Sequence, residues 1–275
     1  MCDLWKHTID ADTPPGAIPA QIAAARNELR DALPAVTTLK LYNAGSFFDP
    51  RAVPVSDYDE IAAHLTGLDR VIVESHPALI GPRVDAFLAA LANMRSWRRG
   101  FSPAALEVAM GLETANPAAL DALNKRFTVD DFIAAAASLR GRGIALRVFL
   151  LVSPPFVPHE EQDTWLIRSI DAAFASGASV VSLVPTRSGN GATEALATSG
   201  LFREPSLADV ERSLAIGLAA AVGRGRVFVD LWDLSRFAAC PACFEGRKAR
   251  LHSMNLTQAV AAPPRPCARC GSSAS

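Results

Sequence analysis

The sequence predicts an α/β fold in which helices cover a parallel β-sheet. Three observations predict it: short apolar runs recur along the chain, segments of helical periodicity separate them, and few charges interrupt the runs. Parallel strands covered on both faces are almost wholly apolar, and connections of helix length favour right-handed crossovers. We therefore expect a full or partial β/α barrel, with a flat doubly wound sheet as the alternative. No G-x-G-x-x-G turn follows the first strand, which disfavours a dinucleotide site.

Six apolar runs are predicted to be strands, over residues 38–44, 70–74, 106–111, 146–152, 179–184 and 226–231. Amphipathic segments between and after them predict helices over residues 18–33, 57–65, 79–97, 160–175, 206–222 and 247–260. Asn116 and Pro117 form a helix-start signal, and a further helix is expected to end near Arg140. Residues 186–193 are expected to form a polar loop.

Composition limits the classes of protein to which the chain can belong. The formal net charge is −1, so the chain as a whole does not attract phosphate backbones. No apolar run approaches the ~20 residues of a membrane span, and the start has no signal-peptide pattern. The sequence therefore predicts a cytoplasmic protein without a membrane partner.

Charged residues also sit within the predicted strands, and among them are Lys40, Glu107 and Arg147. A buried charge without a partner costs several kcal/mol, about 3–5 when one partner of a pair is removed. These side chains are therefore expected to point inward, where they pair with one another or face a polar cavity. One interpretation is a structural salt bridge between Glu107 and Arg147, and the other is a cavity for a zwitterionic cofactor or substrate.

The segments after the strands carry a resemblance to a known family. Such loops are where the functional residues of α/β barrels collect, although each loop alone is ordinary turn chemistry. Their order resembles that of radical S-adenosylmethionine (SAM) proteins of the Elongator/NifB-like superfamily, near the radical SAM subunits of archaeosine synthases. The matching segments cover nearly the whole chain: residues 2–5 (CDLW), 41–50 (LYNAGSFFDP), 73–77 (VESHP), 111–116 (GLETAN), 124–128 (NKRFT), 151–156 (LVSPPF) and 254–258 (MNLTQ).

The resemblance implies a [4Fe–4S] cluster that binds SAM, in a partial barrel of radical SAM type that lacks its first strand. Cys2 would be the catalytic cluster's last thiolate ligand and Met1 the internal Met of a C-x-M-C motif. One thiolate cannot hold a four-iron cluster. Two further cysteines are therefore expected upstream of Met1. The sequence is interpreted either as truncated at its N-terminus or as beginning at a start codon that was placed too late. A chain that begins at Met1 would instead be a catalytically inactive barrel.

The resemblance also implies a set of cofactor-binding residues, named by their positions in this sequence: Gly45, Ser46, Glu74, Glu113, Ser153 and Arg187. The first two would meet the SAM amino group, and Glu74 would face SAM or the substrate. Glu113 would lie near the ribose and adenine. Ser153 and Arg187 would lie near the adenine and the carboxylate.

Four of the five cysteines form two pairs with C-x2-C spacing, which are Cys240 with Cys243 and Cys267 with Cys270. Two such pairs, each at a turn, can close a tetrahedral four-thiolate site of the kind that holds structural zinc. A second iron–sulfur cluster would use the same ligands, and zinc is favoured. We therefore expect residues 1–236 to form the barrel and residues 237–275 a small metal-binding extension.

Three functions remain open. The first is a radical SAM enzyme, which cleaves SAM reductively to a 5′-deoxyadenosyl radical that abstracts hydrogen from a substrate. Its partners would be SAM, an electron donor for the cluster, and a substrate. The resemblance to archaeosine synthases suggests RNA modification, with tRNA as the candidate substrate. The second is an inactive barrel that acts as a scaffold. The third is a zinc-knuckle RNA-binding protein, for which basic residues between the cysteine pairs would contact phosphates.

Overall fold

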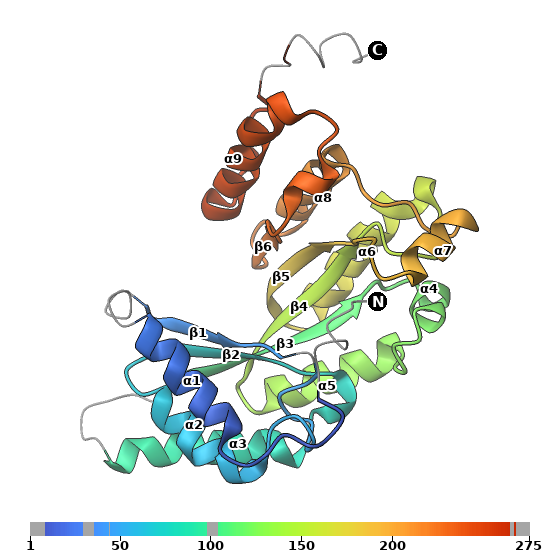
Figure 1. Ribbon diagram of the computed structural model, residues 1–275. Coiled ribbons are helices and arrows are strands. Elements are labelled where there is room, and N and C mark those ends of the chain that lie inside the picture. Colours follow the sequence, from blue (N-terminus) through green and yellow to red (C-terminus); the bar gives the residue numbers. More distant parts are fainter. Residues whose placement is uncertain (1–8, 30–35, 44, 98–103, 265–266, 268–275) are drawn as a thin grey trace. The chain divides into compact units, whose positions relative to one another are not determined.

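The computed structural model describes residues 9–29, 36–43, 45–97, 104–264 and 267. Its six strands form one sheet whose hydrogen-bonded order follows the chain from β1 to β6 (Figure 1). A doubly wound sheet would reverse its strand order, so the sequential order excludes that alternative. The strands are β1 (Thr38–Leu41), β2 (Arg70–Glu74), β3 (Ala105–Glu113), β4 (Ala145–Val152), β5 (Ala178–Pro185) and β6 (Arg226–Val229). All six overlap the predicted runs.

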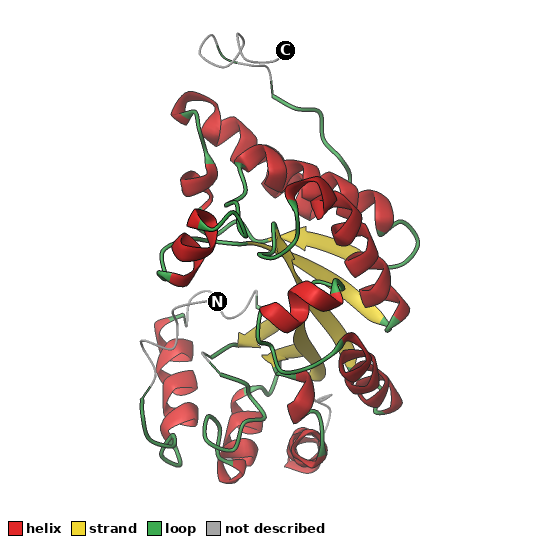
Figure 2. Cartoon of the chain, turned by 90° about the vertical axis from the view of Figure 1, so that its right-hand side faces the viewer, coloured by secondary structure: helices red, strands yellow, loops and turns green. Residues whose placement is uncertain are grey.

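Helices alternate with the strands in the order of the chain (Figure 2). They are α1 (Ala17–Glu28), α2 (Tyr58–His64), α3 (Pro82–Trp97), α4 (Pro117–Ala122), α5 (Val129–Gly141), α6 (Gln162–Ala175), α7 (Ala192–Thr198), α8 (Leu207–Ala220) and α9 (Pro241–Thr257). The predicted start of α4 is confirmed, because Asn116 Oδ1 accepts a hydrogen bond from the Ala119 amide at 3.0 Å. None of the described helices is long and apolar enough to span a membrane.

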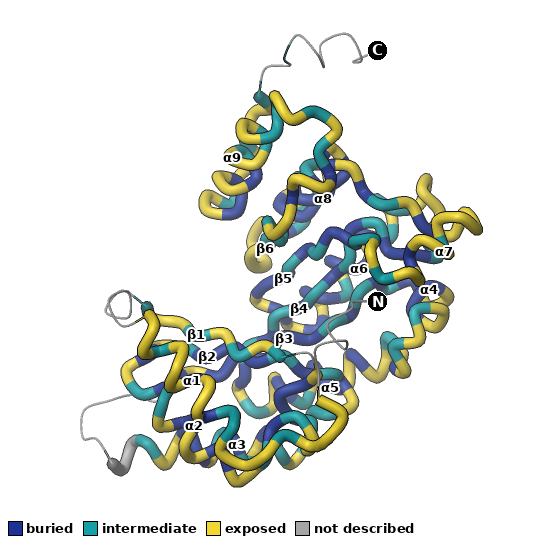
Figure 3. Tube along the Cα trace, viewed as in Figure 1, coloured by how far each residue is buried: buried dark blue, intermediate teal, exposed yellow. Residues whose placement is uncertain are grey.

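The described chain divides into two compact units. The N-terminal unit comprises residues up to 111 together with 131–146, and the C-terminal unit comprises residues 112–130 and those from 147 onward. Strands β2 to β5 are largely buried, β1 has no buried residue, and the helices expose their outer faces (Figure 3). The sequence instead predicts a boundary between residues 236 and 237, between the barrel and the metal-binding extension, and that boundary stays a prediction.

In the N-terminal unit, parallel pairing of β1 with β2 and of β2 with β3 forms one half of the sheet. Helix α1 packs on α2, and α2 packs on α3. The buried charge on β3 is neutralised here, because the Glu107 side chain is 1% exposed and pairs with Arg70 at 2.5 Å. The register places Arg70 opposite Ala105, two residues before Glu107 on the neighbouring strand. The predicted salt bridge of Glu107 with Arg147 stays a prediction.

In the C-terminal unit, β5 pairs with β6, and α6, α8 and α9 pack around them. Arg147 donates to Ser182 Oγ at 3.1 Å, and its guanidinium lies over the Phe228 ring. Two details differ from the sequence-based expectations. Helix α7 begins at Ala192, within the predicted polar loop over residues 186–193. Helix α9 begins at Pro241 rather than near residue 247.

Candidate functional site

The turn after β1 is held in place by an aromatic core of the N-terminal unit. Phe47 and Phe48 are 2% and 0% exposed. The Phe47 ring centroid lies 4.8 Å from that of Phe87 and 5.7 Å from that of Tyr58. The same turn is joined to the end of β2, because the Phe47 amide donates to the Glu74 carbonyl at 2.8 Å. The apolar half of this family segment is therefore structural.

The polar half of the turn presents two of the predicted SAM residues. Ser46 is buried, and its hydroxyl accepts a hydrogen bond from the His76 amide at 2.9 Å. Gly45 is exposed, and a Cβ added there would meet only the Ala52 Cβ, at 3.7 Å. That distance is an ordinary contact, so the fold itself does not require glycine at this position. Asn43 Oδ1 is buried and has no hydrogen-bond partner among the described residues, which costs free energy unless a bound donor pairs with it.

Glu113 ends β3 in a left-handed conformation, with φ of 65°. Its carboxylate pairs with Lys125 at 2.6 Å, and Asn124 and Arg126 on either side of that lysine also have positive φ. Such conformations are costly for residues other than glycine and cluster at functional sites. This bent segment thus brings a cation to a carboxylate at the carboxyl end of β3.

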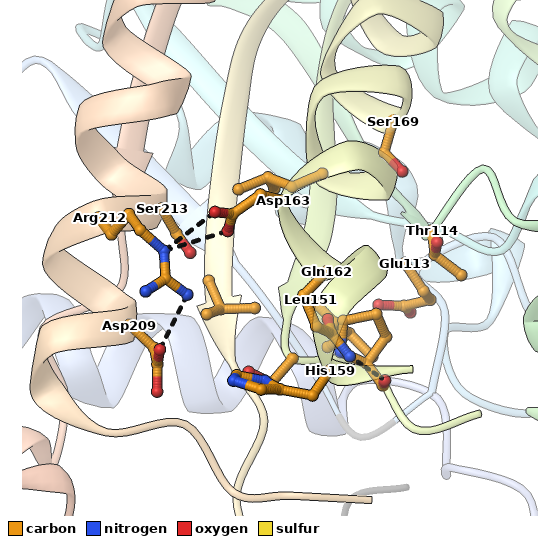
Figure 4. A pocket seen from close by; sticks show the side chains of 14 residues that line it. Glu113, Thr114, Leu151, His159, Gln162, Asp163, Ser169, Asp209, Arg212 and Ser213 are labelled. Carbon is orange, nitrogen blue, oxygen red and sulfur yellow. Dashed lines mark hydrogen bonds and ion pairs between the residues drawn. The ribbon is translucent and has the colours of Figure 1, made fainter. Parts of the chain in front are cut away.

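Ser153 follows β4 and also has a positive φ, of 54°. The chain beside it is fixed by Thr186, whose amide and hydroxyl both donate to the Val152 carbonyl. Glu113 and Ser153 line the same pocket (Figure 4), whose cavity volume of about 10 Å³ is enough for about one water. The pocket therefore links two predicted residues but is too small to hold SAM.

Beyond those two residues, the pocket contains an ion-pair network between α6 and α8. Arg212 pairs with Asp209 at 2.9 Å and with Asp163 at 3.1 Å (Figure 4). Burial raises the pKa of Asp209, but hydrogen bonds from Ser206 and the charges of Arg203 and Arg212 outweigh it, so the pKa is lowered. Because Asp209 and Ser206 form the capping box of α8, this network is structural.

Arg187 follows β5 and is held by the segment after β6. It pairs with Asp230 at 2.8 Å, donates to the Trp232 carbonyl at 2.7 Å, and lies over the Trp232 ring. Its Nε is buried and has no hydrogen-bond partner among the described residues. The sequence did not single out Asp230, although a charge inside the predicted strand over residues 226–231 was the available signal.

The cysteine site is the most complete cluster of potential ligands in the described chain. The Sγ atoms of Cys240, Cys243 and Cys267 all lie within 4.8 Å of one another, and those of Cys240 and Cys267 are 3.7 Å apart. Four thiolates around zinc are expected about 3.7–4 Å apart. The first pair opens α9 instead of forming a separate turn, with Cys240 at the N-cap and Pro241 at the first helical position.

The chain returns to the first cysteine pair along α9. Gln258 ends the helix in a left-handed conformation. Arg250 then donates to the Ala261 carbonyl at 2.8 Å, and a Cβ on Gly246 would lie 3.7 Å from Pro264. These contacts run back along the helix toward Cys267. Two of the basic residues proposed to contact RNA, Arg247 and Arg250, are already paired with Glu211 of α8, which weakens the RNA-binding interpretation.

The remaining predictions concern residues of which no structure is described. Cys2 and Cys270 lie outside the described residues. The predicted metal ligands are therefore tested only at Cys240, Cys243 and Cys267, which do come together. The six predicted SAM-contacting residues all follow or end a strand, and their assignment to SAM stays a prediction.

No family model matches the chain. A protein named archaeosine synthase subunit beta, from Methanosarcina acetivorans, is 29% identical over 214 residues, which cover 75% of this chain and 58% of that protein. A protein of the same name from Thermococcus kodakarensis is 27% identical over 127 residues, or 45% of this chain and 36% of that protein. The chain thus spans little more than half the length of the first of these relatives.

Two solved structures resemble the fold. Elp3 from Methanocaldococcus infernus, solved with an N-terminal deletion, has a TM-score of 0.64 at 13% identity and covers 94% of this chain and 64% of its own. A radical SAM methyltransferase from Sphaerobacter thermophilus has a TM-score of 0.51 at 17% identity, over 82% of this chain and 60% of its own. At these identities the likeness shows the fold alone, and it confirms the predicted fold class. The chain is therefore a relative of the archaeosine synthase beta subunits, with the α/β fold of Elongator-like radical SAM proteins.

Proposed function

We propose that the chain binds SAM at the carboxyl ends of its strands, as part of a radical SAM enzyme whose substrate is RNA. The observation that carries the proposal is the placement of the expected SAM residues. Glu74 and Glu113 end a strand, Ser153 directly follows one, and the others, Gly45, Ser46 and Arg187, lie in the loops that follow β1 and β5. Functional loops collect at the carboxyl ends of parallel strands. The relatives named archaeosine synthase make a nucleoside in tRNA the candidate substrate.

The side chains at these strand ends fit the chemical groups of SAM. Asn43 Oδ1 is a buried acceptor that no described residue pairs with, it lies close in sequence to the exposed Gly45, and it suits an ammonium group. Glu113, oriented by Lys125, can accept hydrogen bonds from ribose hydroxyls. Arg187 carries a buried Nε–H for which the described part of the chain offers no acceptor, and this donor suits a carboxylate.

The cluster and SAM together supply one-electron chemistry that begins with reductive cleavage of SAM. The chain's own contribution is to bind and orient. Cys2 would provide one thiolate to the cluster, for which two further thiolates are needed. The turn at Gly45 and Ser46 would fix the amino end of SAM, while Glu113 and Ser153 would fix its nucleoside.

The SAM site is tested by equilibrium dialysis of the purified protein with labelled SAM. Gly45→Val is expected to weaken SAM binding at least about tenfold, because a branched side chain fills the space next to the turn while the fold accepts a Cβ. Gly141→Val is the matched control, since Gly141 is exposed, has nothing within 4 Å, and ends α5. Equal binding by the parent protein and Gly45→Val would refute the assignment of this turn.

The thiol cluster supports a second, separate function, which is a structural metal site with zinc as the expected ion. Its support is the distance between the sulfurs of Cys240 and Cys267, which matches the spacing around a tetrahedral thiolate site. Elemental analysis of aerobically purified protein is expected to find about one zinc per chain. An oxygen-sensitive brown protein that loses iron on Cys267→Ser would favour a second iron–sulfur cluster instead.

A further inference from the structure

The outer edge of β6 is closed by two amide side chains. Val227 donates to Gln258 Oε1 and accepts from Gln258 Nε2, both at 2.9 Å. Val229 donates to Asn255 Oδ1 at 2.9 Å and accepts from Asn255 Nδ2 at 2.8 Å. Asp230 instead donates to Leu183 of β5. The two amides therefore take the place of a neighbouring strand along the edge that β5 leaves open.

Asn255 lies in α9 and Gln258 directly follows it, so both amides depend on how this helix is attached to the rest of the protein. Its buried residues are Leu251, Met254 and Asn255, out of 17 in the helix. Isolated helices of this length are marginal in water, and most helical stability comes from the packing of an apolar face. A helix with so small a buried face needs further anchors to hold its side chains against β6.

Two polar anchors are present, and both act on the N-terminal half of α9. Glu211 of α8 pairs with Arg247 at 2.6 Å and with Arg250 at 3.3 Å. The thiol cluster joins the first turn of the helix to Cys267 at the end of the returning segment. A metal ion there would close a loop around the whole helix, from Cys240 through Gln258 and back to Cys267.

We propose that metal binding at Cys240, Cys243 and Cys267 controls whether Asn255 and Gln258 stay hydrogen-bonded to the outer edge of β6. This inference rests on the proposed structural metal site. With the ion bound, α9 is fixed at its N-terminus, and Asn255 and Gln258 stay paired with the strand. With the ion removed, α9 detaches more often, and the outer-edge groups of Val227 and Val229 lose their partners. The cysteines thus protect a sheet edge to which none of them binds, since the groups on β6 are covered by Asn255 and Gln258.

Amide hydrogen exchange at single-residue resolution tests this coupling on the full chain, with zinc bound and after chelation. Removal of the metal is expected to speed exchange of the Val227 and Val229 amides at least about tenfold. The Asp230 amide is the internal control, because its acceptor lies on β5, and its rate is expected to change by less than about twofold. Elemental analysis before and after chelation verifies the metal content.

The outcomes separate the coupling from the metal site. A chain that binds no metal overturns both. A chain that binds and releases metal with unchanged rates at Val227 and Val229 overturns the coupling alone. Equal acceleration at Asp230 also overturns it, because β6 would then be unfolding as a whole. Asn255→Leu with zinc bound is expected to speed exchange at Val229 and to leave Val227 protected by Gln258, and a uniform response would contradict the assigned hydrogen bonds.

Discussion

Replacement of Asn255 by leucine tests the cover over β6 by its effect on stability. The leucine side chain is similar in size but can neither donate to nor accept from Val229, which is 3% exposed. Each buried backbone group left without a partner costs about 1–3 kcal/mol. Because one donor and one acceptor are affected, we expect the free energy of unfolding to fall by about 2–6 kcal/mol.

The assay is urea unfolding at neutral pH, followed by circular dichroism. His252→Ala is the matched control, since His252 is an exposed residue of the same helix, and its effect is expected to stay within about 0.5 kcal/mol. If Asn255→Leu changes stability no more than His252→Ala does, the side-chain amide does not stabilise the edge. The reasoning about α9 would then be wrong.

Three further predictions concern the C-terminal unit. Because the pKa of Asp209 is lowered in the folded protein, its stabilisation is present above the unfolded value of about 3.9 and is lost as pH falls through the folded pKa. The difference in unfolding free energy between the parent and Asp209→Asn should therefore be larger at pH 7 than at pH 3, and a difference that does not shrink would contradict it. Glu211→Gln should lower stability by about 1–3 kcal/mol in the same assay, because two arginines lose a charged partner; an unchanged midpoint would count against this anchor. Cys243→Ser should lower the zinc content measured by elemental analysis, and full retention would remove Cys243 from the ligand set.

The strands were predictable because burial on both faces imposes a local signal. Runs such as residues 146–152 are apolar enough to be recognised without knowledge of their neighbours, and β4 spans Ala145–Val152. Helix α7 was missed because Leu196 is the one large apolar residue in its sequence, so no apolar periodicity marks it. The start of α9 was missed although Pro241 at the first helical position was a usable signal.

Pairings between distant residues were harder to predict than the elements. The partner of Glu107 at Arg70 depends on the register between β2 and β3, which the sequence does not state. Asn255 and Gln258 were recognised only as part of a family segment, and their role appears once α9 is placed against β6. The cysteine cluster, by contrast, was predictable from the C-x2-C spacing alone. Its two halves meet because the chain reverses direction after Gln258.

The turn after β1 shows how a family segment divides into structural and functional parts. Phe47 and Phe48 are buried in the core, so their presence is explained by packing. Gly45 is exposed and has room for a side chain, so packing does not explain it. A residue that the fold does not require is the better candidate for contact with a ligand, and this reasoning places the functional part of the segment at Gly45.

The central claim, that the chain serves radical SAM chemistry, is tested most directly by the release of 5′-deoxyadenosine from SAM. The protein is expressed together with the in-frame codons that precede Met1, reconstituted with iron and sulfide without oxygen, and reduced. The account predicts that 5′-deoxyadenosine forms and that Cys2→Ala abolishes it, because the cluster loses a thiolate ligand. Absence of the product from reconstituted protein, or undiminished product from Cys2→Ala, would contradict the account.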